Sequence, residues 1–137
     1  MYLGIDFGTK KIGLAVGKEI PYELATLPNR DDVFERIVKL CDQEKIERII
    51  IGTPVFESGD QGSLAPEITK FGERLKKETK LPIYFEPENL TTQTALELLK
   101  EEGVTPAEIE NKVDQTAARL ILEQYIANEE ETSQEAL

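Results

Sequence analysis

Apolar and polar residues alternate along the first stretch of the chain. Apolar residues occupy every second position on both sides of a Gly8-Thr9 turn: Leu3, Ile5 and Phe7, then Ile12, Leu14 and Val16. A period of two is typical of a β-strand, so this stretch predicts a β-hairpin. Asp6 lies near the end of the first strand, where a carboxylate is costly to desolvate unless a cation or hydrogen bonds compensate for it. Asp6 is therefore a candidate metal ligand, and the alternative is a residue that caps the turn.

The remaining chain predicts three more strands and a series of helices. Residues 21–27 predict a third antiparallel strand, and the apolar runs at 46–51 and 81–85 predict buried strands. Helical spacing predicts a helix from Val33, with Asn29 or Asp31 as its cap, a second over 64–80 and a third around Ala95 to Leu99. A capping box at Thr105 predicts a short helix, and the last predicted helix covers 111–127. The order β-β-β-α-β-α-β-α-α predicts an α/β fold with a five-stranded mixed sheet, flanking helices and right-handed crossovers. We expect Asp6 on a central strand.

The length of the chain and the distribution of its charges limit its possible domain organisation. Its 137 residues suffice for one compact domain, which we assign to residues 1–127. Residues 128–137 carry glutamates and no basic residue, and they predict a disordered acidic tail. No basic segment precedes the first strand, and no apolar run approaches the length of a membrane span. We therefore expect a cytoplasmic protein that does not bind membranes.

The composition excludes several kinds of chemistry. The chain has no histidine and one cysteine, which rules out a Cys/His zinc site, a Ser-His-Asp or Cys-His triad and an intrachain disulfide. Any metal must bind oxygen ligands, which favours Mg²⁺ or Mn²⁺. Cys41 falls in a predicted amphipathic helix, and we interpret it as inert packing.

The net charge of −11 is unfavourable for a nucleic-acid-binding protein. Basic residues outnumber acidic ones between Lys70 and Lys80, which we interpret mainly as a solvated helix face. The charge lowers the nucleic-acid affinity that we expect without removing the hypothesis.

Three acidic residues from separate segments are candidates for one shared site. Glu88 follows the strand predicted at 81–85, and ligands of open α/β sheets bind at the carboxyl ends of strands. Asp114 extends the core-facing stripe of the last helix toward its amino terminus, although a helix-dipole role is the alternative. Together with Asp6, these carboxylates could converge on a divalent metal ion.

A hydroxyl and two cations follow Asp6 along the chain. Thr9, Lys10 and Lys11 lie at and just after the predicted hairpin turn. A metal-binding carboxylate beside cations suits a site that acts on a phosphate ester.

Four motifs in this order resemble the YqgF/RuvX family, the proposed pre-16S rRNA nucleases, which are also described as Holliday junction resolvase-like. The resemblance covers about residues 2–126. Residues 4–15 match the family's opening motif, G-x-D-x-G-x-[KR]-[KR]-I-G-x-A, and residues 51–54 with Gly59 match its G-x-P…G loop. Residues 88–95 fall on the motif D-E-R-x-[ST]-T-x-x-A, and residues 114–122 fall on D-x-x-A-A-x-x-[IL]-L.

The resemblance implies a ribonuclease H-like fold and a hydrolase that cleaves phosphodiester bonds with Mg²⁺ or Mn²⁺. Its substrate would be structured nucleic acid, specifically the 5′ end of pre-16S rRNA during ribosome biogenesis. The implied catalytic and metal-binding residues are Asp6, Glu88 and Asp114. The implied substrate-binding residues are Thr9, Lys10, Lys11, Asn89, Thr91 and Thr92.

The chain departs from the family pattern beside Glu88. Pro87 and Asn89 stand where the family has an aspartate and an arginine, and asparagine cannot replace the charge of a guanidinium. Glu86 is a candidate to replace the aspartate, and Lys10 or Lys11 to supply the phosphate contact.

Alternative functions are a Holliday junction resolvase that acts on branched DNA and a catalytically silent nucleic-acid-binding protein. A kinase-like phosphotransferase is disfavoured, because the chain has no room for a second half-domain. The sequence leaves open whether the protein is a monomer or a homodimer.

Overall fold

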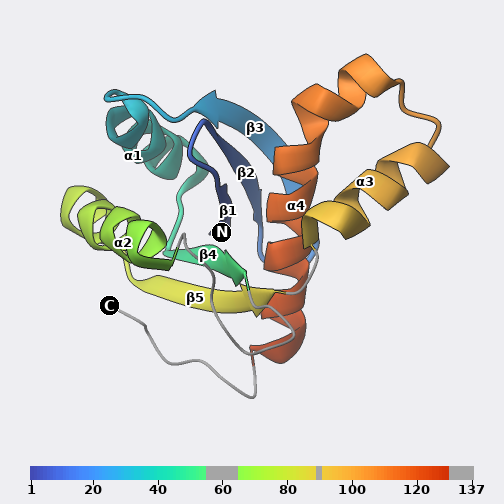
Figure 1. Ribbon diagram of the computed structural model, residues 1–137. Helices are drawn as coiled ribbons and strands as arrows, with labels where there is room; N and C mark the ends of the chain where they lie inside the picture. The colour runs from blue at the N-terminus through green and yellow to red at the C-terminus, as the bar shows by residue number, and fades with distance from the viewer. Residues whose placement is uncertain (55–64, 89–90, 130–137) are drawn as a thin grey trace.

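The protein is built on a five-stranded mixed sheet with helices on both faces (Figure 1). The computed structural model describes residues 1–54, 65–88 and 91–129. The strands are β1 (Tyr2–Phe7), β2 (Lys11–Gly17), β3 (Tyr22–Pro28), β4 (Arg48–Pro54) and β5 (Ile83–Glu88). Their order across the sheet is β3-β2-β1-β4-β5. Because β1 pairs antiparallel with β2 and parallel with β4, the predicted mixed sheet and the central position of Asp6 are confirmed.

The helices divide between the two faces of the sheet. They are α1 (Val33–Glu44), α2 (Ala65–Thr79), α3 (Thr91–Glu101) and α4 (Pro106–Asn128). Figure 1 shows α1 and α2 on one face and α4 on the other, with α3 packed beside α4. No helix within the described residues is long and apolar enough to cross a membrane.

Alternation along β1 sorts its side chains between two cores. Leu3 and Ile5 belong to the larger cluster, which also contains residues of α1 and α2. Tyr2 belongs to the smaller cluster under α4, where its ring packs edge-on against Tyr125 at 6.0 Å. The two faces of the central strand therefore pack against different helices.

Small residues let α4 lie directly on the sheet. A Cβ on Gly4 would lie 2.8 Å from the carbonyl oxygen of Ala118 and 3.0 Å from the Cβ of Leu122. Ala117 and Ala118 are themselves fully buried. A larger side chain at Gly4 would push the helix away, because close-packed interiors do not absorb added volume.

Two predicted strands have different boundaries in the structure. The strand predicted at 46–51 is Arg48–Pro54, because Lys45 (φ 54°) ends α1 in a left-handed conformation and the Ile46 amide donates to the Cys41 carbonyl at 2.9 Å. The strand predicted at 81–85 is Ile83–Glu88, since its pairing with β4 continues to the end of both strands. Glu88 therefore ends β5 instead of following it.

The two helices predicted after Thr105 are one helix, α4. Thr105 caps it as predicted, since its hydroxyl accepts a hydrogen bond from the Glu108 amide at 3.4 Å. No glycine or proline interrupts the chain between Pro106 and Asn128, so nothing ends the predicted short helix before the predicted long one begins.

The first two residues of the predicted tail at 128–137 belong to the end of α4 and its contacts with the sheet. Asn128 is the last residue of α4, and Glu129 has its carboxylate 3.1 Å from the Arg48 guanidinium. Residues 130–137 lie outside the described residues. The prediction missed this contact because it joins residues 81 positions apart.

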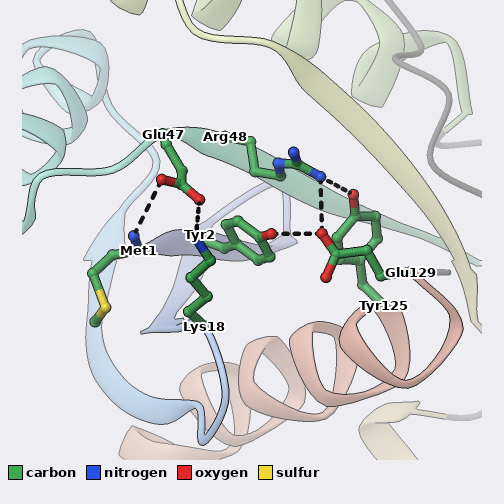
Figure 2. A network of polar contacts seen from close by, with 7 residues as sticks. All are labelled: Met1, Tyr2, Lys18, Glu47, Arg48, Tyr125 and Glu129. Atoms are coloured by element: carbon green, nitrogen blue, oxygen red, sulfur yellow. Dashed lines mark hydrogen bonds and ion pairs between the residues drawn. The ribbon is translucent and has the colours of Figure 1, made fainter.

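Arg48 fastens the carboxyl end of α4 to the sheet (Figure 2). Its guanidinium donates to the Tyr125 hydroxyl at 2.8 Å and to the Glu129 carboxylate at 3.1 Å. The same carboxylate accepts from the Tyr2 hydroxyl at 2.5 Å. The guanidinium also lies 4.8 Å from the ring centroid of Tyr2 and 4.9 Å from that of Tyr84. Burial and the hydrogen bond to Glu129 raise the pKa of Tyr2 to about 12, so this hydroxyl remains a donor at neutral pH.

Candidate active site

Asp6 lies on the sheet face that α4 covers. Tyr2 and Gly4 precede it at intervals of two residues, and both contact α4. Side chains alternate between the faces of a strand, so Asp6 points to the same side. It is half-buried there, and its cross-strand partner on β2 is Gly13, which has no side chain.

Asp114 reaches the same place from α4. A Cβ on Gly13 would overlap the carbonyl group of Asp114 and would lie 2.8 Å from the Gln115 amide nitrogen. Residues directly opposite each other on antiparallel strands have Cβ positions about 5 Å apart. Asp6 and the Asp114 backbone therefore border on the same glycine, although they are 108 positions apart in the sequence.

The protein environment disfavours the charged form of Asp114. Burial raises the pKa of this carboxyl, and the charge of Lys11 partly offsets the effect. A further cation nearby would stabilise the charged form of this carboxylate. Shifted pKa values of this kind are common among carboxylates at functional sites.

Glu88 occupies the last position of β5, opposite Pro54 of β4, at the carboxyl ends of these two parallel strands. Its side chain lies outside the described part of the structure. Among the residues that are described, no three acidic or cysteine side chains gather closely enough to hold a metal ion. The predicted set of three carboxylates therefore stays a prediction, and its completion depends on Glu88.

Glu86 is engaged with α4. Its side chain is 7% exposed, and its carboxylate accepts a hydrogen bond of 2.6 Å from the Gln124 amide. The same amide donates to the Pro87 carbonyl at 2.5 Å. Glu86 is thus hydrogen-bonded to α4, and the suggestion that it replaces the aspartate of the family pattern stays a prediction.

The turn that carries the predicted phosphate-binding residues is held by Asn29. The Asn29 side-chain amide donates to the Gly8 carbonyl at 2.9 Å, and its backbone amide donates to the Lys10 carbonyl at 2.8 Å. Thr9, Lys10 and Lys11 are all exposed at this turn. The sequence pattern suggested Asn29 as a helix cap, but α1 is capped at Asp32 without a side-chain hydrogen bond. The actual role of Asn29 had no signal in the sequence, because its partners lie about 20 positions away.

Several predicted substrate contacts lie outside the described residues. Asn89 and the loop at 55–62 belong to segments that the structure does not describe. Thr91 and Thr92 begin α3, but their side chains are not described. Their proposed contacts with substrate stay predictions.

The donor chemistry of this region fits a hard divalent cation. Asp6 and Asp114 offer carboxylate oxygens, which are the ligands that Mg²⁺ and Mn²⁺ prefer. The charge of Lys11 acts on the Asp114 carboxyl, so a cation already lies near one of these acids.

The strand order and the helix α4 that covers one face of the sheet are those of a ribonuclease H-like fold. The chain belongs to the family described as "RuvX: Holliday junction resolvase", whose pattern matches residues 1–128. Fold and family together place it among the hydrolases that cleave phosphodiester bonds.

Relatives of similar length share about a third of its residues. A protein of Maridesulfovibrio salexigens named "Putative pre-16S rRNA nuclease" is 32% identical over 130 residues, which cover 91% of this chain and 96% of the relative. A protein of Rickettsia bellii with the same name is 35% identical over 126 residues, which cover 88% of this chain and 82% of the relative.

Solved structures share the fold at much lower identity. RuvC of Thermus thermophilus in complex with a Holliday junction substrate superimposes with a TM-score of 0.56 at 13% identity, over 96% of each chain. A second structure of Thermus thermophilus RuvC gives a TM-score of 0.54 at 15% identity, over 92% of this chain and 95% of that one. The likeness confirms the ribonuclease H-like architecture that the motifs implied.

Proposed function

We propose that this chain is a divalent-metal-dependent nuclease that matures the 5′ end of pre-16S rRNA. The observation that carries the proposal is that Gly13, the cross-strand partner of Asp6, lies against the Asp114 backbone, in a chain whose fold and family are those of nucleases. The name shared by its relatives supports the substrate.

Asp6, Asp114 and Glu88 would hold the metal, which we propose is Mg²⁺ or Mn²⁺. When bound in nucleases, such ions lower the pKa of the attacking water and stabilise the leaving oxygen. The close packing of α4 on Gly4 of β1 and Gly13 of β2 would hold Asp6 and Asp114 in place relative to each other, which is the preorganisation that this task requires. With no histidine in the chain, protons must leave through carboxylates, lysines or water.

Lys10 and Lys11 would bind the phosphate groups of the substrate. Both side chains are exposed on a turn that Asn29 fixes, and Lys11 is close enough to affect Asp114 electrostatically. A cation in that position neutralises a phosphate next to the carboxylates and orients the scissile bond. Thr9 adds a hydroxyl at the same turn.

The test is cleavage of a labelled RNA that spans the 5′ end of 16S rRNA, with Mn²⁺ or with chelator. We expect cleavage by the wild type only with metal, and a loss of about 100-fold or more for Asp6→Asn, which keeps the shape of the side chain and removes its charge. Asp31→Asn is the matched control, because Asp31 is exposed and lies before α1. Equal activity of wild type and Asp6→Asn would contradict the proposal.

A four-way DNA junction in the same assay tests the second candidate. The family description and the RuvC fold favour junction resolution as the alternative activity. Preferential cleavage of the DNA junction would show that junction resolution, and not RNA maturation, is the activity of this protein. Asn89→Arg tests the departure from the family pattern, and we expect it to raise activity or substrate affinity. Absence of cleavage by both wild type and Asn89→Arg would instead indicate a silent nucleic-acid-binding protein.

A further inference from the structure

A basic hollow lies beside the candidate active site, at the edge of the sheet formed by β3. It encloses about 460 Å³ between the end of β3, the start of β2 and the amino-terminal half of α4. Three of its lining residues are cations, Lys10, Lys11 and Arg30, and none of the described residues that line it is acidic. In a chain with a net charge of −11, such a cluster is out of proportion to the composition.

The opposite wall of the hollow is polar and ordered. The Thr26 hydroxyl donates to the Asn111 carbonyl at 3.3 Å, which ties β3 to α4. The Gln115 side-chain amide lies 3.5 Å from the same hydroxyl. The amide groups of Asn111 and Gln115 and the hydroxyl of Thr26 are hydrogen-bonding groups that suit phosphate oxygens and sugar hydroxyls.

The hollow adjoins the acids through β2. Thr26 is the cross-strand partner of Gly13, and Gly13 is in turn the partner of Asp6 and touches the Asp114 backbone. Adjacent strands lie about 4.8 Å apart, so two spacings, about 10 Å, separate the backbone at Asp6 from the backbone at Thr26 in the hollow.

Its cations are available to an anion. None of the ion pairs found among the described residues involves Lys10, Lys11 or Arg30. Arg30 is exposed, and the two acids that follow it, Asp31 and Asp32, do not line the hollow. The charge of Lys11 acts on the nearby Asp114 carboxyl.

We propose that this hollow binds the backbone phosphates of the nucleic-acid strand as it leaves the active site across β3, with Arg30 as its outer contact. The inference rests on the proposed nuclease function and deepens it, because it names the path of the substrate. Contacts to phosphates carry no sequence information, so the hollow positions the strand and sets the salt dependence of binding.

The experiment measures the affinity of fluorescently labelled single-stranded RNA, and DNA of the same sequence, in chelator at several salt concentrations. Arg30→Gln should weaken binding of both by about tenfold at about 0.1 M salt and reduce the slope of log K against log salt by about one. Arg30→Lys should keep the slope, because the charge remains. Arg36→Gln is the matched control, since Arg36 is exposed on α1 and does not line the hollow.

Each outcome separates this inference from the proposed function. If Arg30→Gln keeps the affinity and slope of Arg36→Gln, the inference is wrong, even if the wild type cleaves RNA with Mn²⁺. A wild type that binds neither strand in chelator would also overturn it. If Arg30→Gln lowers the slope but no variant cleaves, the hollow is a nucleic-acid site and the nuclease proposal fails.

Discussion

Gly13 and Asp114 are in backbone contact, because a Cβ at Gly13 would occupy the space of the Asp114 carbonyl group. Gly13 is also the residue opposite Asp6 on the neighbouring strand. The absence of one side chain thus allows an acid on α4 and an acid on β1 to share a neighbour. The site consequently depends on a residue that contributes no functional group.

Replacing Gly13 with alanine should therefore damage stability and activity together. The added methyl group has to displace the helix backbone, and overpacking of this kind costs about 1–3 kcal/mol. Urea unfolding and RNA cleavage at 25 °C measure the two effects. Gly4→Ala is the comparison, because it displaces α4 at Ala118 and Leu122 and not at Asp114. A Gly13→Ala protein with wild-type stability would contradict the packing described for α4.

Asp114→Asn should stabilise the metal-free protein at neutral pH. Burial raises the folded-state pKa of Asp114, so ionising this carboxyl costs free energy of folding above that pKa. The advantage of the variant should be full at pH 7, shrink as pH falls through the raised pKa, and vanish below the ordinary pKa of aspartate, where the carboxyl is protonated in both states. Thermal unfolding in chelator between pH 3 and pH 7 checks this, and a pH-independent difference would argue against it.

Arg48→Met should cost about 2–3 kcal/mol of unfolding free energy. The change removes charged hydrogen bonds to Tyr125 and Glu129 and the contacts with two tyrosine rings, while it keeps most of the apolar stem. Urea denaturation measures the loss, with Arg36→Met as the control on an exposed helix face. Equal midpoints for the two variants would show that the network in Figure 2 contributes little.

Asn29→Ala should loosen the turn that presents Lys10. The variant loses the 2.9 Å hydrogen bond to the Gly8 carbonyl, which contributes about 1 kcal/mol in a typical protein. Asn29→Asp should be worse, because a carboxylate would face the carbonyl oxygen. We expect weaker RNA binding in the same order, and Gln43→Ala on α1 serves as an exposed control. RNA affinity that is unchanged in both Asn29 variants would separate the turn from substrate binding.

Cys41 should resist thiol reagents in the folded protein. It is 5% exposed, and burial raises its pKa to about 12, so very little thiolate exists at pH 8. A disulfide reagent should react in urea and hardly at all in buffer. Fast reaction in buffer would show that α1 opens readily.

The sequence alone was sufficient to predict the five strands, most of the helices and the family. Period-two alternation identified the hairpin around Gly8, and the motif order identified the nuclease family, because both are properties of neighbouring residues. The stripe that ends in Asp114 was correctly assigned to the core-facing side of the last helix, where Ala118 and Tyr125 are buried. The burial of Cys41 likewise followed from the helical spacing of the apolar residues in α1.

Only the tertiary structure decided how distant residues combine. The roles of Gly13, Asn29 and Arg48 depend on partners from other elements. No local sequence pattern predicts that a helix packs on a given glycine or that a given asparagine donates a hydrogen bond to a distant turn. Strand boundaries moved because hydrogen-bond pairing, and not hydrophobicity, determines where β4 and β5 end. The basic hollow likewise appears only when β3 and α4 bring Arg30 and Asn111 together. Local sequence sets periodicity through backbone geometry, whereas a site requires long-range packing to place groups that the chain itself keeps apart.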